Sequence, residues 1–232
     1  MVRIKYILLI VVIVFFSLLS CNKKELVLVK ENKVDDYNYL GNEKGRYCVY
    51  KVKHIIHDDE VDVHDTLESI LKVYIGDTLK DNLGKAVNKM YRYIWNKNTN
   101  TWDILNVWTI YKDGNFGVVN EENQRLVKLL FPLDVNNYWN ANRFNDNDSL
   151  TYRVVNLHRK ILIDNILFDS TLTVEQENYF TLVDFKRKNE VYAKGIGLIS
   201  KYYKDLRIKN FDSTKVQKGE EWYYTIKSFG KE

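Results

Sequence analysis

Cysteine is nearly absent from this sequence, with only Cys21 and Cys48 among 232 residues. A fold held together by several disulfides is therefore excluded, because such frameworks need multiple cysteine pairs. If Cys21 is modified, as argued below, Cys48 has no disulfide partner. We expect Cys48 to be a buried small hydrophobic residue, since nothing nearby in the sequence supplies the base that a nucleophilic thiol needs.

The sequence also lacks an apolar run long enough to span a bilayer. The run from Ile7 to Phe16 has ten residues, whereas a membrane-spanning helix needs about 20. The basic residues Arg3 and Lys5 precede it. These proportions are typical of a signal peptide, with a short signal helix.

The residues that follow, Leu18-Leu19-Ser20-Cys21, resemble the lipobox of bacterial lipoproteins. The resemblance implies that the leader is cut before Cys21 and that Cys21 receives a diacylglycerol. It also implies an acyl group such as palmitate on the new amino terminus. Two acyl chains suffice for stable membrane anchoring. The alternatives are an ordinary secretory signal with an incidental cysteine, or an uncleaved anchor helix.

We therefore expect three parts: a lipoprotein signal peptide (residues 1–20), a lipidated cysteine with a polar tether (21–44) and a β domain (45–232). Asn22 is not the aspartate that directs retention at the inner membrane in some bacteria. The resemblance thus implies a lipid-anchored envelope protein of the outer membrane, on either its periplasmic or its surface face. The membrane is the expected partner, with an envelope protein or a glycan as further candidates.

Proline and alanine are scarce, and no long segment repeats apolar residues at helical spacing. The chain instead has 17 tyrosines, 5 tryptophans and 10 phenylalanines, which suit the half-buried surface of a pleated sheet. We predict an all-β fold: a single antiparallel domain, built as a sandwich or a strongly curved half-barrel. The formal charge of +4 falls to +2 when Arg3 and Lys5 leave with the signal peptide, so charge gives no reason to expect a nucleic-acid partner.

Turn-forming residues separate the predicted strands. These strands are Arg46–His57, Leu67–Tyr74, Lys89–Asn96, Thr101–Tyr111, Phe116–Val119, Arg125–Leu133, Leu150–Leu157, Ile161–Leu167, Ser170–Gln176, Tyr179–Lys186, Glu190–Tyr203 and Glu220–Phe229.

Near the end of the chain, Tyr192-Ala193-Lys194-Gly195-Ile196-Gly197-Leu198-Ile199 resembles a motif of uncharacterised Bacteroidota lipoproteins. The stretch from Val127 to Leu133 fits the same group. The resemblance implies a small β-rich exported domain and lends no catalytic residues. We interpret Gly195 and Gly197 as a bulge or a close backbone approach within a strand.

The segment Asp134–Ser149 is the longest predicted loop, rich in the asparagine and aspartate that favour turns. Its aromatic residues Tyr138, Trp139 and Phe144 are candidate binding residues. Stacking on a sugar or docking on a protein is one role for them, and packing at a strand end is the commoner one. We expect Trp139 to cover the core as a lid.

His54, His57 and His64 lie among acidic residues and are the candidate metal ligands. However, His54 and His57 are three apart, which places them on opposite faces of a strand. The acidic run beside them lacks calcium-loop spacing. A solvated acidic loop is the preferred interpretation, and we expect no metal or other cofactor.

Motifs for a serine hydrolase, a zinc protease, a cysteine–histidine pair and a phosphate loop are absent from the sequence. Our first hypothesis is therefore a non-enzymatic binding or structural β module. The second is a half-barrel that carries a lipid or other apolar ligand, and the third is a hydrolase with scattered catalytic residues. A filled core would favour the first hypothesis, and an open apolar trough would favour the second.

Overall fold

Residues 46–231 form one antiparallel sheet of 12 strands in a computed structural model that describes residues 36–232. The predicted all-β antiparallel fold is confirmed. The signal peptide, Cys21 and the first part of the expected tether lie outside the described residues. The strands are β1 (Arg46–Asp58), β2 (Val63–Lys80), β3 (Ala86–Asn96), β4 (Thr101–Asp113), β5 (Phe116–Glu121), β6 (Gln124–Leu130), β7 (Tyr138–Asn140), β8 (Thr151–Ile163), β9 (Ile166–Phe180), β10 (Asp184–Ala193), β11 (Gly197–Lys209) and β12 (Asp212–Lys231).

The strand order is β6-β5-β4-β3-β2-β1-β12-β11-β10-β9-β8-β7. Neighbours in the sheet are thus neighbours in the chain, except that β1 pairs with β12 at the centre. The two edges approach each other: Val127 N, in β6, donates to Ala141 O just after β7 at 2.9 Å. The result is a nearly closed, barrel-like sheet, which is the strongly curved alternative of the prediction and not the sandwich.

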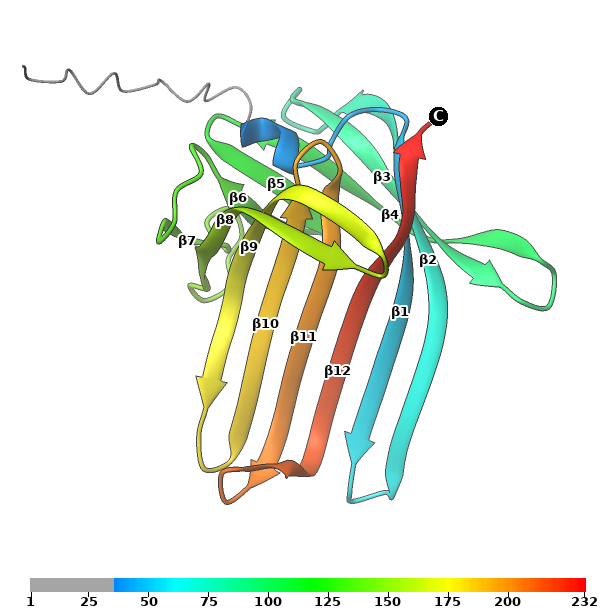
Figure 1. Cartoon of the computed structure of the whole chain (residues 1–232). Coiled ribbons are helices and arrows are strands. Elements are labelled where there is room, and N and C mark those ends of the chain that lie inside the picture. The colour runs from blue at the N-terminus through cyan, green and yellow to red at the C-terminus, as the bar shows by residue number, and fades with distance from the viewer. Residues whose placement is uncertain (1–35) are drawn as a thin grey trace, which may run out of the picture. The chain divides into compact units, whose positions relative to one another are not determined.

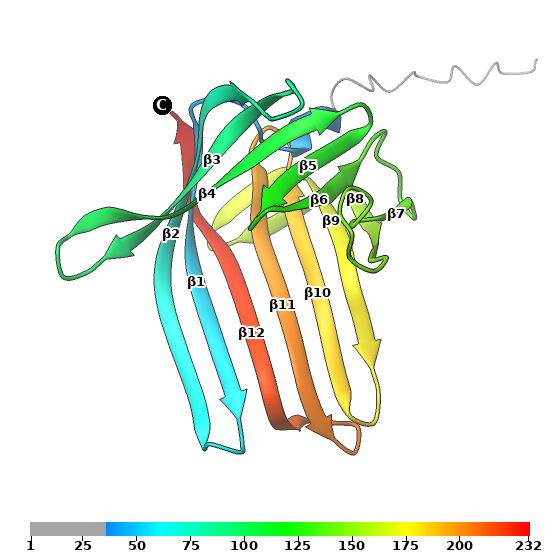
Figure 2. The same ribbon diagram turned by 180° about the vertical axis from the view of Figure 1, so that it is seen from behind.

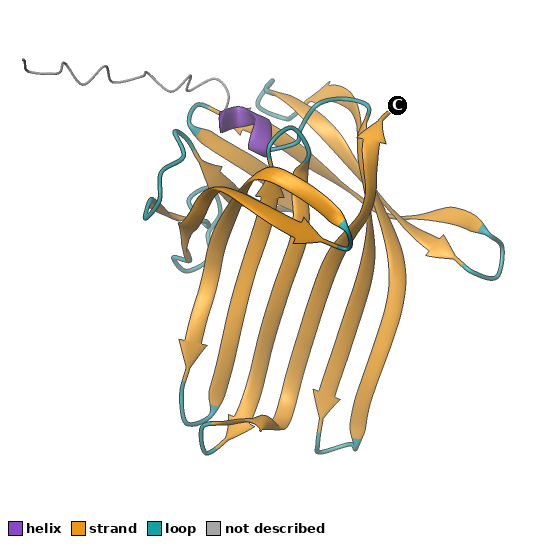
Figure 3. Ribbon diagram, in the orientation of Figure 1, coloured by secondary structure: helices purple, strands orange, loops and turns teal. Residues whose placement is uncertain are grey.

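Closure is confined to one end of the sheet. Strands β1, β2 and β9 to β12 continue past it as an open, curved sheet, and the tip of the β3–β4 hairpin projects to one side (Figures 1 and 2). Strands make up most of the described structure, with one short helix, η1 (Asp36–Tyr39), at the closed end (Figure 3). No helix within residues 36–232 has the length and apolar character needed to cross a membrane.

The core lies in the closed end, where side chains of one face alternate inward along each strand. Tyr39, Val127, Leu129, Leu172 and Val174 have essentially no exposed surface there. Tyr39 and Leu40, which precede the predicted β domain (45–232), also belong to this core. Burial of these two side chains ties η1 to the sheet.

Three predicted strands are wrong because each contains a hairpin turn. Ile161–Leu167 spans the turn at Asp164-Asn165, where both residues have positive φ. Two consecutive positive φ angles are typical of the tight turns that match the twist of a hairpin. Tyr179–Lys186 and Glu190–Tyr203 likewise cross from β9 to β10 and from β10 to β11.

Candidate ligand-binding cavity and trough

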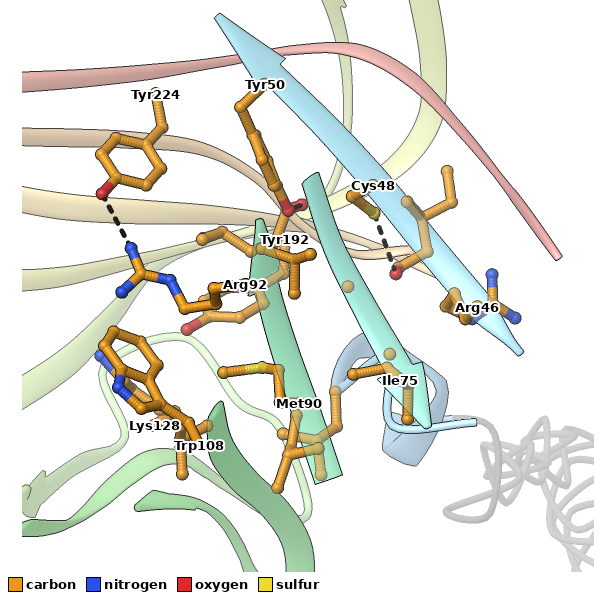
Figure 4. Close-up of a pocket in the computed structure, with 18 of the residues that line it drawn as sticks. Arg46, Cys48, Tyr50, Ile75, Met90, Arg92, Trp108, Lys128, Tyr192 and Tyr224 are labelled. Atoms are coloured by element: carbon orange, nitrogen blue, oxygen red, sulfur yellow. Dashed lines mark hydrogen bonds between the residues drawn. The ribbon is translucent and has the colours of Figure 1, made fainter. Parts of the chain in front are cut away.

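The inward side chains of the closed end leave a cavity of about 110 Å³, which we call the upper cavity. Its wall is mostly apolar because the strands that surround it place alternate aliphatic residues inward. Figure 4 shows these side chains converging from several strands. The apolar part of the wall includes Leu40, Val73, Ile75, Met90, Ile110, Val119 and Leu198.

A second hollow of about 570 Å³ lies on the inner face of the open part of the sheet, and we call it the trough. Its rim reaches solvent, since Leu67 is 56% exposed and Leu105 is 48% exposed. Large apolar side chains left open to water in a concave surface are typical of a binding site. The trough is lined by Val52, His54, Leu67, Ser69, Leu71, Arg92, Ile94, Leu105, Trp108, Lys201, Tyr203, Glu220, Trp222 and Tyr224.

The upper cavity and the trough share five lining residues, Leu71, Arg92, Trp108, Lys201 and Tyr224, which we call the junction. Two of them, Arg92 and Lys201, are cations. The upper cavity and the trough therefore lie next to each other, with the junction residues facing both.

Arg92 reaches the junction from β3 and is only 9% exposed. Its Nη2 donates to Tyr224 OH at 3.3 Å (Figure 4), and its Nη1 donates to Asn106 Oδ1 at 3.3 Å. Its guanidinium carbon lies 3.9 Å from the Trp108 ring centroid, a cation–π stack. β3 and β12 are three positions apart in the sheet, about 14 Å along it. The Arg92–Tyr224 contact thus spans the interior.

The orientation of Arg92 is fixed by the carboxylate of Glu122. Asn106 Nδ2 donates to Glu122 Oε1 at 2.9 Å, and Trp108 Nε1 donates to the same oxygen at 3.0 Å. Asn106 and Trp108, the two β4 residues that contact Arg92, are thus both held by Glu122. Glu122 acts through these neutral groups and does not itself pair with Arg92.

Lys201 comes from β11, and its ammonium group lies among aromatic rings. Nζ is 5.6 Å from the Tyr224 ring centroid and 5.9 Å from that of Tyr203. Burial lowers the pKa of Lys201 below its ordinary value of 10.5, and the attraction of Glu190 does not offset this. Lys128 and Arg92, which carry like charge, lower it further.

A buried ion cluster lies above the junction, across the closed end. Lys128 of β6 pairs with Glu121 at 2.8 Å and with Glu190 of β10 at 3.1 Å. Tyr192 OH also donates to Glu190. Burial opposes ionisation of Glu190, but Lys128, Lys201 and the Tyr192 hydroxyl hold its pKa below 4.5. Removal of one partner from such a cluster costs about 3–5 kcal/mol, so these groups stabilise the closed end.

Two further polar side chains of the upper cavity, those of Cys48 and Tyr50, are neutral. Burial raises the pKa of the Cys48 thiol to about 11, and the Sγ contacts Ile196 O at 3.9 Å. Tyr50 OH donates to Leu198 O at 2.7 Å. The expected burial of Cys48 is confirmed, and its protonated thiol is not an activated nucleophile.

The predicted aromatic binding residues separate into three environments. Tyr138 is 75% exposed, whereas Trp139 is 6% exposed and its Nε1 donates to Val127 O at 2.8 Å. Phe144 packs edge-on against Phe116, with ring centroids 5.5 Å apart. None of the three lines the upper cavity or the trough. A binding role for them stays a prediction, while the expected burial of Trp139 over the core is observed.

The three candidate metal ligands each contact a different carboxylate. His54 Nε2 is 3.0 Å from Glu220 Oε2, His57 Nε2 is 3.1 Å from Glu221 Oε1, and His64 is 3.3 Å from Asp59 Oδ1. Glu220 and Glu221 are adjacent on β12, so His54 and His57 do lie on opposite faces of the sheet. Across residues 36–232, no group of three or more histidine, cysteine or acidic side chains is placed to hold a metal.

His158 has partners that the sequence did not indicate. Its Nδ1 lies 3.0 Å from Tyr39 OH and 3.2 Å from Ser170 Oγ, and Tyr39 OH lies 2.7 Å from that same Oγ. His158 has a positive φ at a bulge between β8 and β9. This contact fastens η1 to the sheet and lies outside both the upper cavity and the trough.

Sequence reasoning missed Arg92 and Lys201, although a signal was present. Met90, Arg92 and Ile94 alternate along β3, and Ile199, Lys201 and Tyr203 alternate along β11. A single cation on the inward, apolar side of a strand is unusual, because charge is rarely buried without a partner. A cation in an alternating apolar strand face is therefore a signal for each residue. It does not predict that Arg92 and Lys201 lie near each other across the interior.

No protein-family model matches the chain, and no curated protein matches it. Two solved structures resemble it. One is a protein described as exported, with a YmcC-like fold, from Bacteroides fragilis: 9% identity, TM-score 0.40, covering 82% of this chain and 98% of that one. The other is a protein described as a lipoprotein from Parabacteroides distasonis: 9% identity, TM-score 0.43, covering 83% and 98%.

At these identities and TM-scores the two likenesses carry no argument about this chain, and the motif at Tyr192–Ile199 stays a resemblance.

Proposed function

We propose that this chain is a lipid-anchored envelope protein whose β domain binds an elongated apolar small molecule in the upper cavity and the trough. The observation that carries the proposal is the open, mostly apolar trough, which adjoins the upper cavity at the junction. A filled inner face of the sheet would leave no such trough. The open apolar trough therefore favours a ligand carrier over a purely structural module.

The lipid anchor in this proposal rests on the residues Leu18 to Cys21. Cys21→Ser should abolish incorporation of an alkyne-labelled palmitate in cells, because serine lacks the thiol that accepts the diacylglycerol. Cys48→Ser is the matched control and should label as the wild type does, since Cys48 is buried in the β domain. Equal labelling of wild type and Cys21→Ser would contradict the anchor.

Ligand binding can be tested on the full chain in lipid nanodiscs. A long-chain fatty alcohol that carries a diazirine near its far end would be activated by light, and the labelled peptides identified by mass spectrometry. We expect labels on peptides that contain Leu71, Ile94 or Trp108. Labels confined to residues 1–35, or to the outer face of the sheet, would contradict binding in the trough.

A matched pair of variants on β2 makes this test specific. Ser69 lines the trough, so Ser69→Trp should fill part of it and reduce the labelling. Glu68 lies one residue away, on the opposite face, where it pairs with Lys51 at 3.1 Å. Glu68→Trp should leave labelling of the trough unchanged.

A further inference from the structure

We propose that the ligand is a single-chain amphiphile with an anionic head group, held at the junction by Arg92, Lys201 and the Tyr224 hydroxyl, with its apolar chain in the trough. This inference rests on the proposed function, because it names the class of ligand for the same site. It predicts that an uncharged chain of equal length binds more weakly.

Arg92 has no counter-ion among the described residues. Its guanidinium is buried, yet both of its hydrogen bonds go to neutral oxygens, those of Asn106 and Tyr224. Within residues 36–232 no carboxylate forms an ion pair with it. A guanidinium presents five donors, so capacity remains for an anion. Burial of a charge without a counter-ion is costly, and an anionic ligand would supply that counter-ion.

Lys201 adds a second cation at the junction. Lys201 and Arg92 both contact Tyr224, one over its ring and the other at its hydroxyl. Among the described residues Lys201 has no ion pair and no hydrogen-bond partner for its ammonium group. Two like charges brought together in an apolar wall destabilise the empty site, and an anion between them removes the repulsion.

The buried carboxylates nearby do not fill this role. Glu190 is the strongest opposite charge near Lys201, but its oxygens already accept from Lys128 and from Tyr192. Glu121 is likewise paired with Lys128. The cluster above the junction has one cation, Lys128, and two carboxylates, so its net charge of −1 offsets one of the two junction cations. A net positive charge is left facing the hollow.

The chemistry of the head group follows from its partners. A planar guanidinium beside an ammonium suits a carboxylate or a phosphate monoester, which accept several charge-assisted hydrogen bonds. The wall that continues into the trough, with Leu71, Ile94 and Leu105, suits a hydrocarbon chain. A cationic head group would be repelled at this point.

The test uses three diazirine probes of equal chain length: a fatty acid, an alkyl phosphate and a fatty alcohol. On the full chain in nanodiscs they distinguish a carboxylate head group, a phosphate head group and the absence of any preference for an anion. Half-maximal labelling of the trough peptides should need about tenfold less of at least one anionic probe than of the alcohol, the size expected for charge-assisted hydrogen bonds. The better anionic probe identifies the head group. Equal labelling by all three would overturn the anionic head group and leave the apolar site intact. No labelling of the trough by any probe would overturn the proposed function itself.

Variants of Lys201 tie the preference to the junction. Lys201→Met keeps the length of the side chain and removes the charge, and should remove much of the preference for the anionic probe. Lys201→Arg should retain it. Lys53→Met, on the outer face of β1, removes a charge elsewhere and should change nothing. If Lys201→Met, with an unchanged melting temperature, keeps the full preference, Lys201 does not bind the head group.

Discussion

At the scale of single residues, Trp139 and its neighbours show how far composition predicts burial. The sequence indicated that one aromatic residue of an Asn-rich segment would cover the core, and Trp139 does so. It did not indicate β7, the short strand of residues 138–140 inside this predicted loop. The strand depends on pairing of Trp139 with Tyr152, a contact that local residue preferences do not encode.

Truncation of these side chains should therefore give three different losses of unfolding free energy. Trp139→Ala should cost about 3–5 kcal/mol, because it removes a buried ring. Phe144→Ala should cost less, since Phe144 is half-buried, and Tyr138→Ala should stay within about 0.5 kcal/mol of wild type. Chemical denaturation measures all three. A larger loss for Phe144→Ala than for Trp139→Ala would reverse the assignment.

Gly195 and Gly197 were expected to form a bulge or a close backbone approach within one strand. Gly195 lies in the hairpin turn between β10 and β11, and Gly197 is the first residue of β11. Gly195 has a φ of +77° and open space where a Cβ would lie. Gly197 has a φ of +103°, and a Cβ there would lie 3.1 Å from the Cα of Gly41. Only Gly197 makes a close approach, and it does so to the segment after η1.

Asparagine tolerates the left-handed conformation better than most residues, so it limits the backbone strain at Gly195. At Gly197 the φ lies further from that region and crowding against Gly41 adds to the strain. Gly195→Asn should lower the melting temperature only slightly. Gly197→Asn should lower it by several degrees, because its Cβ displaces the Gly41 segment. The measurement is thermal unfolding followed by circular dichroism. Equal melting temperatures for the two variants would show that crowding at Gly197 is unimportant.

At the scale of elements, the predicted strands failed mainly at hairpins. Tight turns such as Asp164-Asn165 hold only two residues, and the flanking strands Thr151–Ile163 and Ile166–Phe180 are apolar up to the turn. The apolar pattern of the sequence therefore continues across the turn and predicts one strand where the structure has two. The approach of β6 to β7 and β10 could not be predicted from the sequence either. It brings Lys128 next to Glu190, and these residues are 62 positions apart in the chain.

The ion cluster that joins β6 to β10 should make stability depend on acid pH. Because the folded-state pKa of Glu190 is below 4.5, its contribution is fully present above about pH 4.5 and is lost as the pH falls through the lowered value. Glu190→Gln should be destabilised by about 3 kcal/mol at pH 7. Its disadvantage should shrink as the pH falls below 4.5. Urea denaturation at pH 7 and pH 3.5 tests this, and a constant difference would contradict it.

At the scale of the whole molecule, curvature creates the candidate site. Arg92 on β3 and Lys201 on β11 lie four positions apart in the sheet, yet both contact Tyr224. A flat sheet with the same residues would leave two separate surface cations. The sequence predicted the strong curvature as one alternative, and the meeting of these two cations follows only from the closed form.

The pH dependence of anion binding tests this arrangement as a unit. An anion at the junction should raise the pKa of Lys201, which is lowered in the free protein, so affinity should fall as the pH rises through the lowered value. The neighbouring tyrosines stay neutral in this range, because burial raises the pKa of Tyr203 and Tyr224. The other groups that face Lys201 are Glu121, Glu190, Lys128 and Arg92.

Calorimetry of decanoate binding to the full chain in nanodiscs, in two buffers of different ionisation enthalpy, measures the protons taken up. Uptake should be small well below the lowered pKa of Lys201 and should rise toward one proton as the pH passes it. Lys201→Arg should abolish the uptake while it preserves binding, because a guanidinium stays protonated throughout. Uptake that is unchanged in Lys201→Arg would assign the proton to another group and remove Lys201 from the head-group site.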